Sequence, residues 1–232
     1  MTSSGEGTLD GRGHNWWWAE ILQTLPNGNP NRPKLFNCMN CTDTLVEKLL
    51  GKDSPSFHFN FQDVARLVVR RVRVRTDVLA EREALRVGGR LLDVGREIVG
   101  KAGMQRLDIE WKYLLEALLI ELRVPTFPLN TDGIDFSGRD VHVHDVDVQN
   151  FDDSIVAKPT DARGINARCT ENVLVENVVA KGVGLSIGSI SPHADHSCIR
   201  NVTFRNISMP NTMKGIYLKT NPGSTGTGEV SL

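Results

Sequence analysis

The stretch Val141-His142-Val143-His144-Asp145-Val146 decides the fold, because apolar and polar residues alternate along it and the pattern returns elsewhere. Alternation with a period of two predicts a strand that buries one face. The apolar positions recur at Val173, Val175 and Val178, at Val202, Phe204 and Ile207, at Leu67, Val69 and Val72, and more faintly at Thr44, Val46 and Leu49. The chain therefore contains an internal repeat of short strands.

The spacing of the repeat predicts how its units pack. Neighbouring copies are 32 residues apart from 141 to 173, 29 from 173 to 202 and 23 from 44 to 67. One such unit is too short to bury its own apolar face, so successive units must stack, with strands about 4.8 Å apart. The step from 67 to 141 is 74 residues, which is too long for one repeat.

We therefore predict an all-β fold, a parallel β-solenoid. The fourth position of the unit carries Asp145, Asn177 and Asn206, and a recurrent Asn can hydrogen-bond from coil to coil like a ladder. A β-sandwich is the alternative. It requires hairpin turns such as Asn-Gly about every 8 to 12 residues, and few occur.

Composition and charge exclude several classes of protein. The chain has 232 residues, a net charge of -1 and 40% hydrophobic residues. We expect no nucleic-acid partner, because the charge implies no polyanion, and no membrane span, because no apolar run is long enough. Residues 1–5 are polar, so no signal peptide is expected there. We expect a monomer without a cofactor.

The four cysteines predict a disulfide and no metal site. Cys38 and Cys41 form a C-x-x-C pair, but no second pair completes a zinc site. Cys169 and Cys198 open consecutive copies of the repeat, one coil apart, close enough for a disulfide. Glycosylation sequons, which favour a secreted origin, begin at Asn40, Asn201 and Asn206.

Three aspartates stand where the repeat would bring them together. Asp132 is followed by Asp152 and Asp153 after 20 and 21 residues, about one coil. Direct neighbours would lie about 5 Å apart, and a diagonal relation stretches this toward about 6.5 to 9.5 Å, which leaves room for a water and is typical of inverting glycosidases. Repulsion should raise at least one pKa, so that one carboxyl serves as acid and another as base. The alternative is that Asp152-Asp153 is a solvated turn.

Four ordered motifs carry a more specific signal. They are Asn130-Thr131-Asp132-Gly133-Ile134-Asp135, Asp152-Asp153-Ser154-Ile155, Gly182-Val183-Gly184-Leu185-Ser186-Ile187-Gly188-Ser189 and Gly215-Ile216-Tyr217-Leu218-Lys219-Thr220. In order and spacing they resemble glycoside hydrolase family 28, the polygalacturonases and rhamnogalacturonases that depolymerise pectin. Residues 7–13, 16–17, 32–33 and 60–62 resemble the earlier coils of that family.

The resemblance implies a right-handed parallel β-helix, an extracellular location, a pectic polysaccharide substrate and an inverting mechanism. By position, Asp152 would be the general acid, and Asp132 and Asp153 would activate the attacking water. Asn130 would orient Asp132 or a sugar hydroxyl. Lys219 would bind a substrate carboxylate, which suits a point cation facing a uronate.

The chain departs from the family at two positions of these motifs. Val183 stands where the family usually has a histidine thought to tune the acid pair, and Tyr217 stands where it usually has an arginine that grips the uronate. Lys219 is then the only motif cation left to bind a uronate. These departures favour exo-action or another altered specificity, with Tyr217 as a platform for sugar stacking, or a loss of catalysis.

The repeat pattern also predicts the domain organisation. We expect N-terminal coils over 1–78, an inserted helical or non-native segment over 79–123 and catalytic coils over 124–232. Residues 81–85 and 109–122 have helical periodicity, and the segment is predicted to be either a retained intron or a lid over the groove. We expect the β-helix to be incomplete at both ends, and the unpaired strand edges there to lower its stability.

Two other functions stay open. A calcium-dependent pectate lyase would need an oxygen-rich metal site and an arginine base, and no arginine matches within the groove motifs. A non-catalytic or defective pectin-binding solenoid would bind oligogalacturonate without cleaving it.

Overall fold

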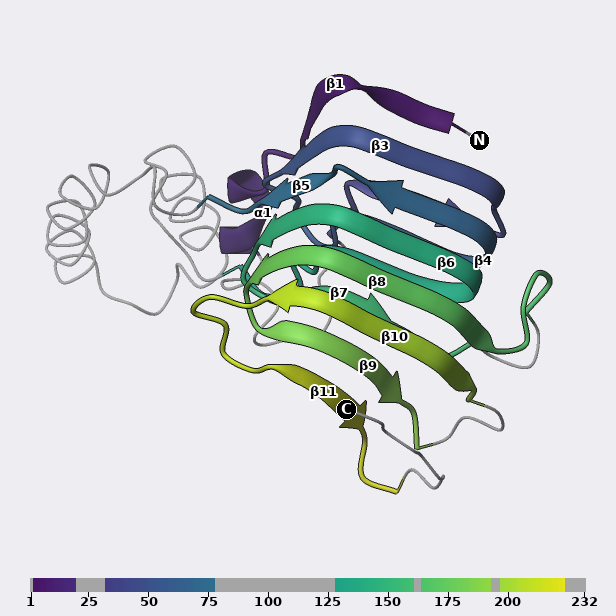
Figure 1. Ribbon diagram of the computed structural model, residues 1–232. Coiled ribbons are helices and arrows are strands. Elements are labelled where there is room, and N and C mark those ends of the chain that lie inside the picture. Colours follow the sequence, from purple (N-terminus) through teal and green to yellow (C-terminus); the bar gives the residue numbers. More distant parts are fainter. Residues whose placement is uncertain (1, 20–31, 78–127, 161–163, 193–196, 224–232) are drawn as a thin grey trace, which may run out of the picture.

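The computed structural model describes residues 2–19, 32–77, 128–160, 164–192 and 197–223 (Figure 1). This part of the chain is almost entirely strand, with one short helix, α1 (His14–Ala19). The strands are β1 (Thr2–Asp10), β2 (Phe36–Met39), β3 (Thr42–Lys52), β4 (Phe59–Arg70), β5 (Arg73–Arg75), β6 (Ile134–Gln149), β7 (Asp153–Ala157), β8 (Thr170–Lys181), β9 (Gly184–Ile190), β10 (Ile199–Ser208) and β11 (Ile216–Thr220).

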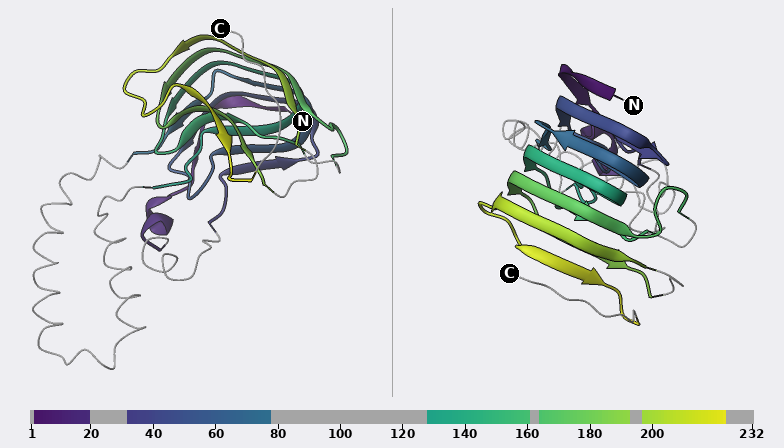
Figure 2. Two further views of the ribbon diagram at one scale, coloured as in Figure 1. Left: turned by 90° about the horizontal axis from the view of Figure 1, so that it is seen from below. Right: turned by 45° about the vertical axis from the view of Figure 1, so that its right-hand side comes forward.

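All pairings between these strands are parallel, and the coils stack in layers (Figures 1 and 2). One wall runs through β2, β4, β6, β7, β9 and β11, and another runs through β1, β3, β4, β6, β8 and β10. The long strands β4 and β6 bend and contribute to both walls. The chain therefore forms a parallel β-helix, as predicted, and the β-sandwich alternative is wrong.

The register of the second wall confirms the repeat. Val46, Val69, Val143 and Val175 pair in one continuous row, which Phe204 extends. Val143 and Val175 are both 0% exposed. Burial of apolar side chains in such rows stabilises the stacked coils.

The first wall buries larger side chains. Phe59, Ile134, Ile155 and Leu185 form one inward row, and each is 0% exposed. The residues between the inward positions point outward, away from this core. A binding or catalytic site on this wall would therefore consist of outward side chains held by strands that pack on the apolar core.

A glycine allows β6 to turn from one wall to the other. Gly138 has φ 139°, and a Cβ there would lie 2.1 Å from the Val64 carbonyl oxygen of the preceding coil. Only glycine tolerates both the backbone conformation and the close approach.

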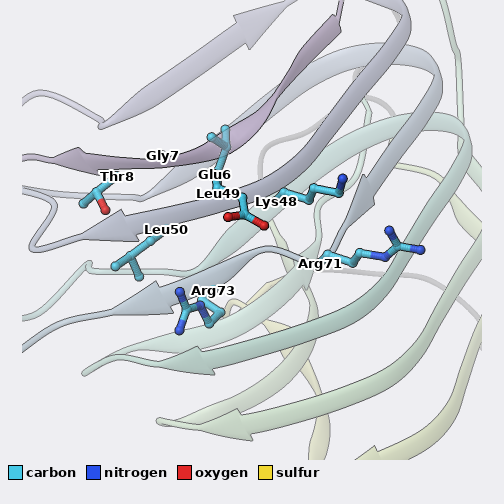
Figure 3. A pocket seen from close by; sticks show the side chains of 8 residues that line it. All are labelled: Glu6, Gly7, Thr8, Lys48, Leu49, Leu50, Arg71 and Arg73. Carbon is cyan, nitrogen blue, oxygen red and sulfur yellow. The ribbon is translucent and has the colours of Figure 1, made fainter.

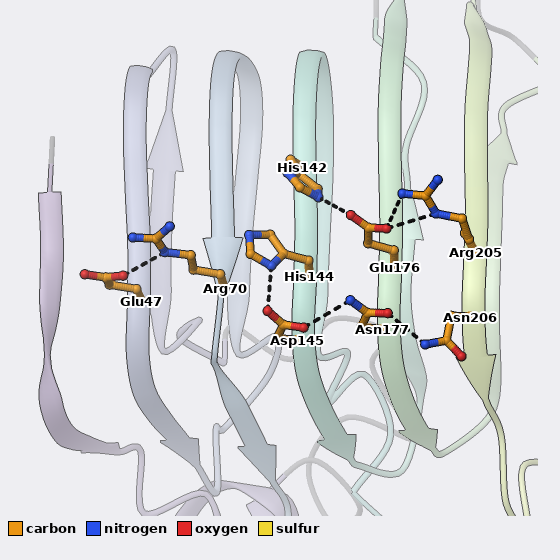
Figure 4. Close-up of polar contacts among 9 residues, drawn as sticks. All are labelled: Glu47, Arg70, His142, His144, Asp145, Glu176, Asn177, Arg205 and Asn206. Atoms are coloured by element: carbon orange, nitrogen blue, oxygen red, sulfur yellow. Dashed lines mark hydrogen bonds and ion pairs between the residues drawn. The ribbon is translucent and has the colours of Figure 1, made fainter.

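Polar side chains form a ladder along the outside of the stack (Figure 4). Asn206 Nδ2 donates to Asn177 Oδ1 at 2.8 Å, and Asn177 Nδ2 donates to Asp145 Oδ1 at 3.2 Å. All three residues have φ between 51° and 54°, a left-handed conformation that Asn and Asp adopt more readily than other side chains. The predicted coil-to-coil hydrogen bonding is therefore present.

Both cysteine pairs form disulfides. The Cys169–Cys198 bond links the coils of β8 and β10, as predicted. The Cys38–Cys41 bond was not predicted, although a C-x-x-C spacing permits it, and it occupies the thiols that a zinc site would need.

The two copies of the repeat that are 74 residues apart in sequence lie on adjacent coils. Leu67 of β4 pairs with Val141 of β6, so these copies of the repeat are neighbours in space. The predicted helical stretches 81–85 and 109–122 lie outside the described residues. The division into 1–78, 79–123 and 124–232 therefore stays a prediction. Within the described part of the chain, no helix has the length and apolar character needed to cross a membrane.

Candidate active site

The three aspartates converge at the edge of the first wall. Asp132 lies in the turn before β6, Asp152 lies just before β7, and Asp153 is the first residue of β7. The Gly133 amide donates to the Asp153 carbonyl at 2.9 Å, which stacks the two turns. One carboxylate oxygen from each aspartate lies within 4.8 Å of the others. The solvated-turn alternative for Asp152-Asp153 is therefore wrong, since Asp153 is 0% exposed.

A buried amide holds these turns in place. Asn150 Nδ2 donates to the Thr131 carbonyl at 2.9 Å and to the Asp153 carbonyl at 2.7 Å. The Phe151 amide donates to Thr131 Oγ1 at 3.2 Å. Because the turns before β6 and β7 share these bonds, the positions of Asp132 and Asp153 are coupled.

Asp152 is the most accessible of the three aspartates. It is half-buried, whereas Asp132 and Asp153 are buried. Its Oδ2 accepts a hydrogen bond from the Asn130 amide and its Oδ1 one from the Asp153 amide, both at 2.8 Å. The structure thus places Asn130 beside Asp152 through its backbone, whereas its predicted partner was Asp132 or a sugar hydroxyl.

Asp153 is surrounded by side-chain donors from the next coils. Ser186 Oγ of β9 donates to Asp153 Oδ2 at 3.0 Å. Lys219 Nζ of β11 donates to the same oxygen, and Tyr217 OH donates to Oδ1. Burial, together with the bond to Asp153, raises the pKa of Tyr217, so its phenol stays protonated as a donor.

The structure places all six residues predicted for the site close together. They are Asn130, Asp132, Asp152, Asp153, Tyr217 and Lys219. Tyr217 and Lys219 contact Asp153 directly. Their predicted roles toward a substrate stay predictions. Val183, at the position of the family histidine, contributes its amide, which donates to the Asp152 carbonyl at 2.9 Å.

The surroundings of Asp132 raise the pKa of its carboxyl group. Burial raises its pKa well above the usual range, and repulsion from Asp135, Asp152 and Asp153 adds to the effect. Its Oδ1 is buried and has no hydrogen-bond partner among the described residues. Asp132 therefore keeps its proton to a pH well above that at which an isolated aspartate ionises.

The spacing of the carboxylates matches direct neighbours, one of the two arrangements expected. One oxygen from each aspartate lies within 4.8 Å of the others, near the separation of about 5 Å for direct neighbours and below the range of about 6.5 to 9.5 Å for a diagonal relation. The spacing rule therefore gives no support for inversion here, and the inverting mechanism stays a prediction from family resemblance. The same oxygens could attract a cation, but the Lys219 ammonium already occupies Asp153 Oδ2.

Sequence reasoning missed three residues of the site. His58, buried before β4, donates from both its backbone amide and Nδ1 to the Asp132 carbonyl, at 2.8 and 3.2 Å. Its Nε2 accepts from the Ser54 amide at 3.3 Å, so the ring is neutral, and burial lowers its pKa to about 4. Asp135 and Lys158 form an ion pair close by. Asp135 belongs to the motif that begins at Asn130, but no sequence pattern indicated that Lys158 would pair with it.

A cavity of about 430 Å³ lies elsewhere, beside β1, β3 and β5 (Figure 3). It is lined by Glu6, Gly7, Thr8, Lys48, Leu49, Leu50, Arg71 and Arg73. None of the six candidate residues lines it, so it is separate from the aspartate cluster.

The stack of parallel coils makes the chain a parallel β-helix protein with a cluster of aspartates on one wall. The Glycosyl hydrolases family 28 model matches residues 1–231, so the chain belongs to this family.

Individual relatives agree with this assignment. The chain is 23% identical to an exopolygalacturonase of Cochliobolus carbonum over 95% of its own length and 37% of the relative. It is 26% identical to endopolygalacturonase A of Aspergillus niger over 99% of its length and 46% of the relative. A polygalacturonase structure from Erwinia carotovora ssp. carotovora superposes with a TM-score of 0.68 at 19% identity, covering 97% of this chain and 47% of that one. The chain thus spans less than half the length of these relatives.

Proposed function

We propose that this chain hydrolyses α-1,4-galacturonosyl linkages in pectin. The observation that carries the proposal is the cluster of Asp132, Asp152 and Asp153, in which Asp152 is half-buried and the other two aspartates are buried. Membership of the family supports the reaction class, and the polygalacturonase relatives support the uronate substrate.

The proposed reaction consumes one water molecule. Asp152 protonates the glycosidic oxygen as the bond from that oxygen to the anomeric carbon breaks. Asp132 or Asp153 removes a proton from the water that attacks this carbon. Three donors already occupy the oxygens of Asp153, whereas Asp132 Oδ1 has no hydrogen-bond partner among the described residues, which supports the base role of Asp132.

The altered cation site bears on specificity. Tyr217 cannot form the bidentate contact of an arginine with a carboxylate, and the relative from Cochliobolus carbonum is named an exopolygalacturonase. The altered contact supports exo-action, whereas the names of the relatives include both an exopolygalacturonase and an endopolygalacturonase. We also propose that the protein acts outside the cell, where glycans could be attached at Asn40, Asn201 and Asn206, whose side chains are exposed.

A reducing-end assay on polygalacturonate and on rhamnogalacturonan tests the proposal, with Asp152→Asn as the decisive variant. The amide keeps the shape of the side chain but cannot donate an acidic proton, so kcat should fall by at least about 10²-fold while substrate still binds. Asp43→Asn is the matched control, because Asp43 is exposed and pairs with Arg66 on the outer surface.

Each other outcome points to a different function. Release of an unsaturated product that absorbs ultraviolet light, with loss of activity in a chelator, would show a lyase. Binding of oligogalacturonate without new reducing ends would show a non-catalytic solenoid. Near-normal turnover by Asp152→Asn would remove Asp152 from the acid role.

A further inference from the structure

A buried ion pair lies beside the aspartate cluster. Asp135 of β6 is 0% exposed although its side chain lies in an outward row of the first wall, next to Asn60 on one coil and Val156 on the other. Lys158, just after β7, places Nζ 3.2 Å from Asp135 Oδ2, and its side chain is 30% exposed. The Lys158 amide donates to the carbonyl of Phe136, the residue after Asp135 in β6, at 2.8 Å. This bond holds the Lys158 backbone against β6.

The pair is held in a partly apolar setting. Lys158 Nζ lies 5.6 Å from the centre of the Phe57 ring, and Lys34 Nζ lies 5.3 Å from it. Asp135 Oδ1 is buried and meets no hydrogen-bond donor among the described residues. A buried carboxylate with so little hydrogen bonding depends on the nearby ammonium group for compensation of its charge.

The charged and titratable groups around Asp132 come from several coils. The anionic groups are Asp135, Asp152 and Asp153, the cationic groups are Lys34, Lys158 and Lys219, and the neutral ring is His58. Lys34 acts on Asp135 and Lys158, and Lys219 acts on Asp153 and Asp135. Asp132 therefore titrates in the field of the whole group.

Within this group, Asp135 and Lys158 act on Asp132 with opposite signs. Among its charged neighbours, Asp135 makes the largest contribution to raising the pKa of Asp132, and Lys158 lowers it. Burial raises the pKa of Asp135 itself to about 6, against the pull of Lys158. Burial alone would lower the pKa of Lys158, but Asp135 and Asp132 outweigh it, so this pKa is raised and the ammonium keeps its charge.

We propose that the Asp135–Lys158 ion pair is a positioning element that sets the protonation of Asp132 and thereby the pH range of hydrolysis. The inference rests on the proposed function with Asp132 as the base, which must be ionised to accept a proton from water. Neither member of the pair needs to touch the reacting atoms. Their effect reaches the reaction through the charge on Asp132.

The pH profile of kcat/KM on oligogalacturonate tests this directly. Asp135→Asn removes the anion but keeps the neighbouring cation, so the acid limb should move to lower pH by about one unit. Adding Lys158→Gln to that variant removes the cation while position 135 stays neutral, so the limb should move back to higher pH. The single Lys158→Gln variant should move the limb to higher pH by a smaller amount, because Asp135 would then take up a proton and cancel part of the change.

A merely structural role would lower kcat or stability without these opposite movements. Asp43→Asn, which removes an exposed carboxylate from an ion pair on the outer surface, should leave the limb in place. If Asp135→Asn does not fold, Lys158→Gln and Lys158→Arg decide. The limb should move in the former and stay in the latter, and identical limbs would overturn the proposal.

The test separates the two proposals. A wild-type chain that releases no reducing ends contradicts the proposed hydrolysis. An active wild-type chain whose acid limb is the same in Asp135→Asn and in the double variant contradicts only the role of the ion pair.

Discussion

Replacement of Lys219 by alanine would separate its two roles, the predicted grip on a substrate uronate and the observed contact with Asp153. Lys219 Nζ donates to Asp153 Oδ2, and the side chains are 25% and 0% exposed. In Lys219→Ala, Asp153 keeps Ser186 Oγ and Tyr217 OH as donors but loses the ammonium that contacts it.

The expected loss of stability follows from this geometry. Removing one partner of a buried ion pair costs about 3 to 5 kcal/mol. Because two donors remain and Lys219 is partly exposed, we expect a smaller decrease in the unfolding free energy, about 2 kcal/mol. We also expect kcat to fall by about 10²-fold, since the carboxylate loses one of the three groups that orient it. Loss of uronate affinity would appear separately as a rise in KM that depends on salt.

Urea unfolding and steady-state kinetics on oligogalacturonate measure these quantities, with Lys181→Ala as a control at an exposed lysine of β8. Unchanged unfolding free energy and unchanged kcat in Lys219→Ala, with only a higher KM, would refute the reasoning from the Asp153 contact. The predicted uronate role would then be the better account.

Three further predictions concern the β-helix and its pH dependence. Val175→Asp places an unpaired charge at a position that is 0% exposed, so it should cost several kcal/mol, and a soluble variant with native circular dichroism would contradict the inward row. Asn177→Ala should lower the unfolding free energy by about 2 kcal/mol, and Asn177→Gly by only about 1 kcal/mol, because both lose the ladder bonds but only alanine is strained at φ 53°. His58 is neutral in the folded protein with a pKa of about 4, below its ordinary 6.5, so its contribution is complete above about 6.5 and is lost as the pH falls toward 4. The difference in unfolding free energy between wild type and His58→Gln should therefore shrink by roughly 3 kcal/mol over that range, and a constant difference would contradict the assignment.

Much of the fold could be predicted because it depends on a local signal. Alternating β-branched residues identified Val143 and Val175 as inward, and the steps between copies predicted which strands pair. The asparagine ladder followed from the same repeat. The three aspartates were brought together by one coil length and by motif resemblance.

The missed parts depend on contacts that cross coils without a repeating pattern. Asp135 lies in an outward row, where a strand residue is usually solvated, and its burial could not be anticipated from alternation. Lys158 and His58 are single residues on other turns, and only the stacked register brings them to Asp132. Carboxylate distances also depend on side-chain orientation, which coil spacing alone does not determine.

The disulfide between Cys169 and Cys198 has a mechanical consequence. In a stack where each coil contacts only its neighbours, a pulling force along the axis can peel coils away one after another, since few bonds share the load at any moment. The covalent link joins the residue before β8 to the residue before β10, so it crosses the boundary at which β10 would separate. A force from the C-terminal side can therefore peel β10 from β8 only as far as Cys198, and complete separation of the two coils requires a reductant as well as force.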